Sequence, residues 1–307
     1  MAIDFELGDR LGARRGTVAM SGIQALLRVP LDQQRADAAT GVRTAGLIAG
    51  YRGSPITGID EAYERDRDML EAHEIRFISG VNEDLAATMV WGRQAAHLEP
   101  DCRFDGVTGL WYGKGPGIDR SLDALRHANL SGVGRYGGVI AAVGDDPACK
   151  SSTVPSASEG LLANLGMPAL YPGSAQELLD FGRWAYELSR TCGLWTGMKV
   201  HTDVADQYAT VDVDPARLGM VTRPDLNGWA PAQSTTLVPA TSLGLEADAF
   251  GPRIEAALAF VAANRLDRTC GAVSDARLGI VAPGKMYADV RSVLSELGLV
   301  TDDDLDR

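Results

Sequence analysis

Short apolar runs alternate with helical stretches along the first two thirds of the chain, and this alternation constrains the fold more than any other feature. The six β-like runs are Thr44–Ala49, Ile75–Ser79, Gly106–Tyr112, Gly138–Val143, Pro168–Tyr171 and Met198–Thr202. Between them the sequence predicts helices at Ile59–Ala72, Asp84–His97, Ile118–Ala128, Ser156–Leu165 and Ala175–Arg190. Strands separated by helices of about 10–16 residues are typical of a parallel sheet covered on both faces. We therefore predict an α/β fold in which helices flank both faces of a parallel sheet.

Outside this region the pattern is weaker. Residues 31–40 predict a polar helix or a loop, residues 203–245 predict a proline-punctuated loop region, and Ile254–Asn264 predicts a helix. Arg277–Gly284 predicts a strand with a tight turn and Lys285–Leu297 a helix, which resembles the opening of a second α/β domain. One such unit cannot bury both faces of a sheet, so we expect it to dock onto the first domain or to belong to a longer protein. The predicted domains are an N-terminal extension (1–42), the main sheet domain (43–240), a linker with a helix (241–276) and a truncated second domain (277–307).

The composition excludes several classes of protein. The 307 residues are 45% hydrophobic and 23% charged, with a net charge of -12, which argues against a nucleic-acid-binding surface. The charged N-terminal residues predict no signal peptide, and no apolar stretch approaches the roughly 20 residues of a membrane span. The four cysteines form no CxxC pair, so we expect reduced thiols and neither a zinc ribbon nor an iron–sulfur cluster. These features predict a cytoplasmic protein without a metal site.

Two loops that follow the first two strands contain candidate functional residues. In Gly50–Thr57, Gly53 and its neighbours would let a ligand approach the backbone at the start of a helix, although a plain strand–turn–helix connection explains the same residues. In the next loop Asn82 is a good helix cap and precedes Glu83. An acidic residue here stabilises the positive end of a helix, or it is a buried carboxylate that hydrogen-bonds a ring nitrogen of a cofactor. Because parallel strands end at one edge of a sheet, we expect these loops to lie together.

Two further loops follow the third and fourth strands. The segment from Gly113 to Gly117 contains Lys114 but lacks the P-loop pattern, which needs Gly-Lys-Ser/Thr. Lys114 and the nearby Arg120 could hold a substrate carboxylate. Asp145 and Asp146 suggest a metal site or an ordinary turn. The Gly-Asp-Gly motif of a thiamine diphosphate metal site and its downstream asparagine are absent, so we expect no diphosphate–magnesium site in this domain.

Taken in order, these loops resemble the N-terminal pyrimidine-binding domain of the 2-oxoacid:ferredoxin oxidoreductases, in particular the indolepyruvate type in its long fused form. The resembling segments are residues 22–30, 50–55, 80–86, 111–117, and 144–146 with 150–152. Residues 279–285 resemble the start of the family's next domain, a transketolase C-terminal-like module. The likeness covers most of the chain, and the ordered set of segments is more specific than any one of them.

The resemblance implies thiamine diphosphate chemistry. The family's catalytic glutamate falls on Glu83, which would hydrogen-bond N1′ of the aminopyrimidine. Ser54 takes the place of a threonine that approaches the substrate, and Arg52 replaces a proline of the same loop. Lys150 is a further candidate for the substrate carboxylate. The expected cofactor-binding residues are Gly53, Pro55, Asn82, Asp145 and Asp146, and the expected substrate-binding residues are Ser54, Arg52, Lys114 and Arg120.

The activity that the resemblance implies is oxidative decarboxylation of an aryl 2-oxoacid. Electrons would pass through 4Fe-4S clusters to ferredoxin, and the acyl group would pass to coenzyme A. This sequence holds neither the diphosphate-binding domain nor the cluster cysteines, so we expect a partner domain or subunit that supplies them and holds Mg2+, and a dimer. The alternatives are another thiamine diphosphate enzyme, of the transketolase or decarboxylase kind, and a non-catalytic assembly or regulatory subunit.

Overall fold

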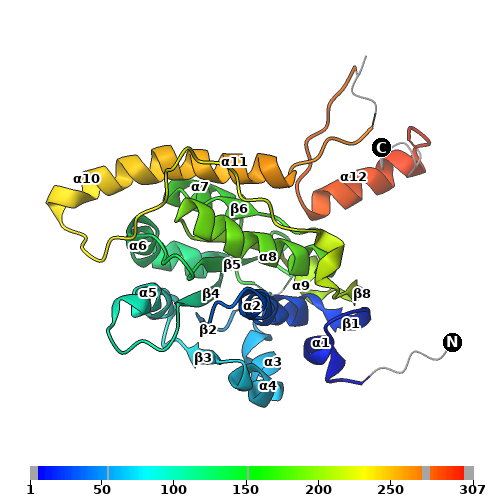
Figure 1. Ribbon diagram of the computed structural model, residues 1–307. Helices are drawn as coiled ribbons and strands as arrows, with labels where there is room; N and C mark the ends of the chain where they lie inside the picture. The colour runs from blue at the N-terminus through cyan, green and yellow to red at the C-terminus, as the bar shows by residue number, and fades with distance from the viewer. Residues whose placement is uncertain (1–5, 54, 151, 272–276, 301–307) are drawn as a thin grey trace.

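The computed structural model describes residues 6–53, 55–150, 152–271 and 277–300. Its centre is a six-stranded parallel sheet in the order β3-β2-β4-β5-β7-β6 (Figure 1). The strands are β2 (Thr44–Gly50), β3 (Ile75–Ser79), β4 (Gly106–Lys114), β5 (Val139–Asp145), β6 (Ala169–Leu170) and β7 (Thr196–His201). Each lies on an apolar run of the sequence, so the predicted α/β fold with a parallel sheet is confirmed.

Helices cover both faces of this sheet. Successive strand residues point to opposite faces, so Ile48 and Leu110 join one core while Leu47 and Trp111 join the other. The first core contains residues of α2 (Gly22–Ala39), α3 (Ile59–Arg65) and α8 (Ala175–Cys192). The second contains residues of α5 (Glu83–Gln94), α6 (Gly115–Ser131) and α7 (Glu159–Leu165). The inner strands β2, β4, β5 and β7 are buried on both sides, which explains why they read as continuous apolar runs, whereas the edge strand β3 is partly exposed.

The segment before the first long strand is part of the folded core. β1 (Thr17–Ser21) pairs antiparallel with β8 (Tyr208–Asp212) in a second, two-stranded sheet. Ser21 then caps α2, because its side chain accepts from the N–H of Gln24 while the Gln24 side chain accepts from the N–H of Ser21. The stretch 31–40, which predicted a polar helix or a loop, is the second half of α2 with its C-cap, Thr40. The short elements nearby are α1 (Asp9–Gly12), α4 (Arg67–Ala72), η1 (Ala96–Leu98), α9 (Thr202–Asp206) and η2 (Pro215–Leu218).

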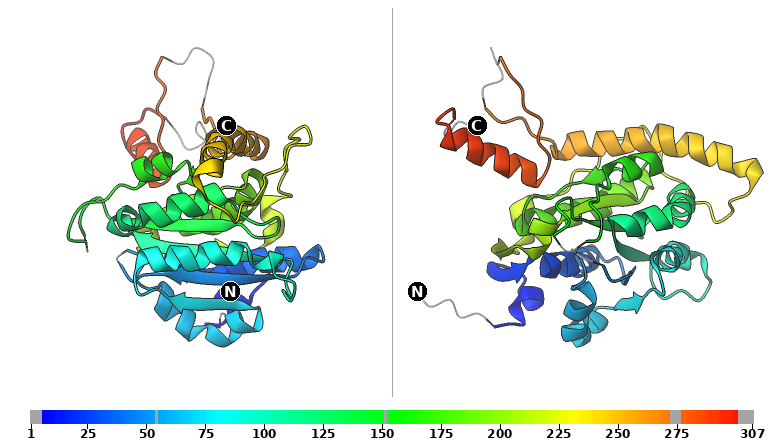
Figure 2. Two further views of the ribbon diagram at one scale, coloured as in Figure 1. Left: turned by 90° about the vertical axis from the view of Figure 1, so that its left-hand side faces the viewer. Right: turned by 180° about the vertical axis from the view of Figure 1, so that it is seen from behind.

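The C-terminal helices lie outside the two main layers. α10 (Pro239–Asp248), η3 (Ala249–Arg253) and α11 (Ile254–Asn264) form a long helical run beside α8, seen at the top of Figure 1. Phe260 of α11 is buried against Leu188 of α8 in a third apolar cluster. α12 (Lys285–Glu296) stands apart from this run in all three views (Figure 2). It has no buried residue, and Lys285 lies 3.6 Å from Asp203 in an ion pair.

Three predictions of local structure were inexact or wrong. Arg277–Gly284 forms no strand, because no strand of the described chain pairs with it and Val281 is fully exposed there. The predicted helix Ile59–Ala72 is two helices broken at Asp66, whose carboxylate binds Arg10 of α1. The predicted loop region of residues 203–245 contains most of α9, β8, η2 and the first part of α10. The domain boundaries stay predictions.

No helix in the described ranges is both long enough and apolar enough to cross a membrane.

Candidate functional site

The loops that follow four neighbouring strands meet at the carboxyl edge of the sheet, as the sequence predicts. The N–H of Gly80, after β3, donates to the carbonyl of Gly50 at the end of β2, over 2.9 Å. A Cβ atom built on Gly53 would lie 2.9 Å from Cδ of Lys114, so the loop after β2 packs on the side-chain stem at the end of β4. Pro55 packs in the same way on Gly144 of β5. The loops of β2, β3, β4 and β5 therefore form one continuous surface.

Glu83 is the first residue of α5 and lies at this edge. The Asn82 side chain caps the helix by accepting from the N–H of Leu85 over 2.9 Å, so capping falls to Asn82 and not to Glu83. The Trp111 indole N–H donates to the carbonyl of Glu83 over 3.1 Å and fixes the backbone at this point. Glu83 is 7% exposed. Asn82 is therefore the helix cap, and the cofactor contact of Glu83 stays a prediction.

The carboxylate of Glu83 packs against two glycines of the Gly113–Gly117 segment. A Cβ atom at Gly117 would lie 2.8 Å from Oε1 of Glu83, and one at Gly113 would lie 3.5 Å from its Cγ. Within the described part of the chain, no hydrogen bond or ion pair reaches this carboxylate. A nearly buried glutamate at a strand-end edge whose carboxylate has no protein partner is more typical of a binding or catalytic group than of a structural one.

Asp145, at the end of β5, is fully buried in a charged cluster. Its Oδ2 accepts from the N–H of Ser158 over 2.8 Å and from its hydroxyl over 2.7 Å. Lys199 of β7 lies 3.4 Å from the same oxygen and also pairs with Glu159. The other oxygen, Oδ1, has no hydrogen-bond partner among the described residues and lies beside Gly115, the first residue of α6. Asp145 therefore joins β5, β7 and the start of α7 below the edge.

Asp146 organises the loop that follows β5. Its carboxylate accepts from the N–H groups of Lys150 over 2.9 Å and of Ser152 over 2.9 Å. The Lys150 side chain extends away to an ion pair with Asp206 at 3.0 Å. Across the described ranges no three His, Cys, Asp or Glu side chains converge to hold a metal ion. The contacts made by Asp146 are those of a turn.

The cationic candidates differ in how they are held. Arg120 forms an exposed ion pair with Asp84 at 3.2 Å. Arg52 pairs instead with Asp60, whose carboxylate is buried. The amine of Lys114 has no ion pair or hydrogen bond with any other described residue. Ser54, the predicted substrate-binding serine, lies outside the described residues.

The comparisons with known proteins bear on what this edge is for. No protein-family model matches the chain. Indolepyruvate oxidoreductase subunit IorA of Methanothermobacter thermautotrophicus is 25% identical over 301 residues, which is 96% of this chain and 43% of the relative. The same subunit of Pyrococcus horikoshii is 24% identical over 304 residues, again 96% of this chain and 42% of the relative. The predicted resemblance to the indolepyruvate oxidoreductases is confirmed.

The chain spans less than half the length of these IorA relatives. A solved structure of 2-oxoglutarate:ferredoxin oxidoreductase from Magnetococcus marinus, with 2-oxoglutarate, coenzyme A and succinyl-CoA bound, aligns with a TM-score of 0.65. It is 12% identical, and the match covers 93% of this chain and 52% of that one. This likeness shows that the parallel α/β fold is shared.

Three features of the edge were missed in the sequence. Lys199 interrupts an apolar strand run, and a charge at such a position signals a buried ion pair. Asp60 resembled an ordinary acidic residue in the first turn of a helix, and only its burial sets it apart. Gly117 lies in a segment that the sequence singles out, but its contact with Glu83 gave no signal, because it depends on how α5 packs on α6.

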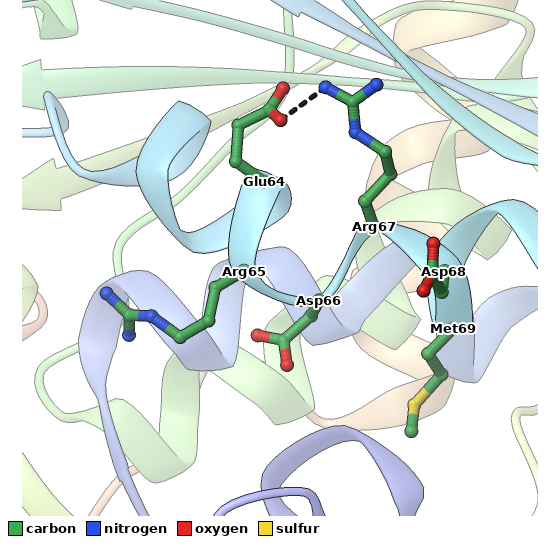
Figure 3. Close-up of a pocket in the computed structure, with 6 residues that line it drawn as sticks. All are labelled: Glu64, Arg65, Asp66, Arg67, Asp68 and Met69. Carbon is green, nitrogen blue, oxygen red and sulfur yellow. Dashed lines mark hydrogen bonds and ion pairs between the residues drawn. The ribbon is translucent and has the colours of Figure 1, made fainter.

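A hollow of about 300 Å³ lies elsewhere on the molecule, at the junction of α3 and α4. It is lined by Glu64–Met69, with Glu64 and Arg67 paired across it (Figure 3). Its lining is charged, and none of the candidate residues from the strand-end loops contributes to it. We assign it no part in the chemistry.

Proposed function

We propose that the chain is the pyrimidine-binding part of a thiamine diphosphate-dependent 2-oxoacid oxidoreductase of the indolepyruvate type. The observation that carries this proposal is Glu83, a nearly buried residue at the carboxyl edge of a parallel sheet whose carboxylate has no partner in the described chain. Its position in the resembling segment of residues 80–86 is that of the family's catalytic glutamate. The similarity to IorA over nearly the whole chain supports the same assignment.

The residues around Glu83 fit an aminopyrimidine ring. A ring nitrogen such as N1′ can share a proton with the carboxylate and so supply a hydrogen bond that no described residue makes. Gly113 and Gly117 leave the carboxylate free of side-chain crowding on one side, and Trp111 holds the Glu83 backbone at its carbonyl. When bound, the cofactor supplies the carbon nucleophile that attacks the 2-oxo group. The task of Glu83 is to hold a proton against the ring nitrogen.

The rest of the reaction is assigned to regions outside this chain. We propose that a partner domain or subunit binds the diphosphate and Mg2+ and carries the 4Fe-4S clusters. In the proposed reaction an aryl 2-oxoacid is oxidised and decarboxylated, ferredoxin accepts the electrons, and coenzyme A accepts the acyl group. We further propose a cytoplasmic dimer. The length of the IorA relatives supports the existence of further parts.

Calorimetric titration with thiamine diphosphate and Mg2+ tests this proposal directly. The full chain is titrated alone and together with the polypeptide from the same organism that carries the diphosphate-binding domain. We expect heat of binding with the partner present and little or none without it, because the diphosphate contributes the larger share of the contacts. If neither titration shows binding although the chain unfolds cooperatively, the chain resembles the family in sequence but does not bind the cofactor, and the proposal is wrong.

Gly117→Ala is expected to lower turnover by about 10-fold to 10²-fold, because a shift of the reacting groups by about 1 Å has effects of this size. The new Cβ would lie 2.8 Å from Oε1 of Glu83 and 2.9 Å from its Cγ, so the carboxylate must move. Stability should hardly fall, since alanine favours a helix more than glycine does. Steady-state kinetics and thermal unfolding measure the two effects.

Gly160→Ala is the matched control, because Gly160 lies in α7 with no atom within 4 Å of a built Cβ. It should leave turnover unchanged. Equal losses in the two variants would mean that the contact with Glu83 is not the cause.

A further inference from the structure

A small polar cluster lies beneath the loop after β2. Asp60, on α3, is 4% exposed, and neither of its carboxylate oxygens accepts a hydrogen bond from a described residue. The phenol of Tyr112, on β4, is buried and likewise lacks a hydrogen-bond partner in the described chain. Burial and then the charge of Asp60 raise the pKa of Tyr112, so the phenol stays protonated. Arg52, in the loop after β2, forms an ion pair with Asp60.

The pair of Arg52 and Asp60 is strongly asymmetric. The side chain of Arg52 is 69% exposed, whereas that of Asp60 is 5% exposed. A buried carboxylate needs a compensating charge far more than an exposed arginine does. Asp60 therefore holds Arg52 through an ion pair at Nε, and most of the Arg52 side chain stays exposed. Arg120 and Lys150 lack such an anchor, because each pairs with a side chain that is itself more than a third exposed.

The anchored guanidinium stands on the same surface as Glu83. The next residue, Gly53, packs on the stem of Lys114, whose amine has no partner among the described residues. Lys114 in turn directly precedes α6, the helix whose Gly117 touches Glu83. Two cations, one of them fixed, thus lie on one side of the proposed cofactor position. A guanidinium presents several donors in a fixed plane, which matches the two oxygens of a carboxylate.

We propose that Arg52 binds the carboxylate of the 2-oxoacid and that Asp60 is the positioning residue that holds Arg52 for this contact. The assignment rests on the proposed function. Of the four cationic candidates for the substrate carboxylate, it selects Arg52, the one that is paired with a buried carboxylate. It also gives the buried Asp60 a role beyond starting α3.

Binding measurements on the full chain test this assignment. The probes are phenylpyruvate and its methyl ester, titrated by calorimetry in the presence of thiamine diphosphate, Mg2+ and the diphosphate-domain partner. The acid should bind more tightly than the ester by about 10-fold or more, the size of one charged hydrogen-bonded contact. Arg52→Gln with Asp60→Asn removes both members of the pair, so no unpaired buried charge remains, and this double variant should lose the preference for the acid. Arg67→Gln, which removes an exposed arginine of α4, should keep it.

Asp60→Asn separates positioning from charge. Arg52 keeps its charge in this variant but loses its anchor, so KM for phenylpyruvate should rise while kcat stays near that of the wild type. Adding Arg52→Gln should cause little further rise, because both changes act on one contact. A full preference for the acid in the double variant, or equal affinity for acid and ester in the wild type, would overturn the assignment. If the cofactor still binds in either of these cases, only the Arg52 assignment fails and the proposed function stands. If the wild type does not bind the cofactor, the assignment and the proposed function both fail.

Discussion

Glu83→Gln is expected to lower turnover of an aryl 2-oxoacid by about 10²- to 10⁴-fold, the usual contribution of a positioned acid–base group. An amide has the shape of the carboxylate but cannot exchange a proton with a ring nitrogen at neutral pH. The Asn82 cap and the hydrogen bond from Trp111 to the Glu83 carbonyl do not involve the Glu83 side chain, so the fold should persist. Single-turnover kinetics with the diphosphate-domain partner, together with thermal unfolding, measure both effects.

Asp84→Asn is the matched control for this experiment. Asp84 occupies the same first turn of α5, but its carboxylate is partly exposed and binds Arg120. Its neutralisation should change turnover little. If Glu83→Gln and Asp84→Asn behave alike, Glu83 serves the helix start and not the chemistry.

Arg190→Met is expected to destabilise the fold by about 3–5 kcal/mol, the cost of leaving one member of a buried ion pair alone. The Arg190 guanidinium donates to both oxygens of Asp37 over 2.7 and 2.8 Å, and both side chains are nearly buried. It also donates to the carbonyls of Gly137 and Tyr136, so one residue joins α2, α8 and the loop before β5. Unfolding in urea, followed by far-UV circular dichroism, gives the free energy of unfolding.

Adding Asp37→Leu to Arg190→Met should recover part of this loss, because the second change removes the unpaired charge. If the two residues act independently, the losses in free energy of unfolding of the two single variants should add up in the double variant. That result would contradict the prediction. The proposed site lies at the other ends of the strands, so the remaining folded protein should keep the cofactor affinity that we propose for it.

The gathering of the strand-end loops at one edge could be predicted from the sequence with few assumptions. Strands buried on both faces are apolar throughout, and parallel strands end at one edge, so the loops at Gly53, Glu83 and Lys114 were expected to lie together, while their order along the edge came from the structure. The same logic failed for Arg277–Gly284. Its apolar residues satisfy the local pattern of a strand, but a strand also needs a neighbour to satisfy its backbone, and the described chain provides none there.

Which residue caps α5, and which carboxylates are buried, was settled only by packing. Asn82 and Glu83 both fit a helix start, and the sequence left capping and catalysis open for that loop. Distances in the folded chain show that Asn82 caps α5 while Gly117 of another helix borders the Glu83 carboxylate. Asp60 and Asp84 are equally acidic first-turn residues in the sequence, yet one is buried under Arg52 and the other is partly exposed.

The sequence by itself determined the parallel α/β layers and the edge at which the candidate residues gather, because periodicity and apolar runs are local properties. Only the tertiary structure decided which charges are buried, which pairs are anchored and which carboxylate lacks a partner. Those properties depend on contacts between residues that are distant in the chain, such as the ion pair of Lys199 with Asp145 and that of Arg52 with Asp60 of α3. No local sequence pattern encodes these contacts.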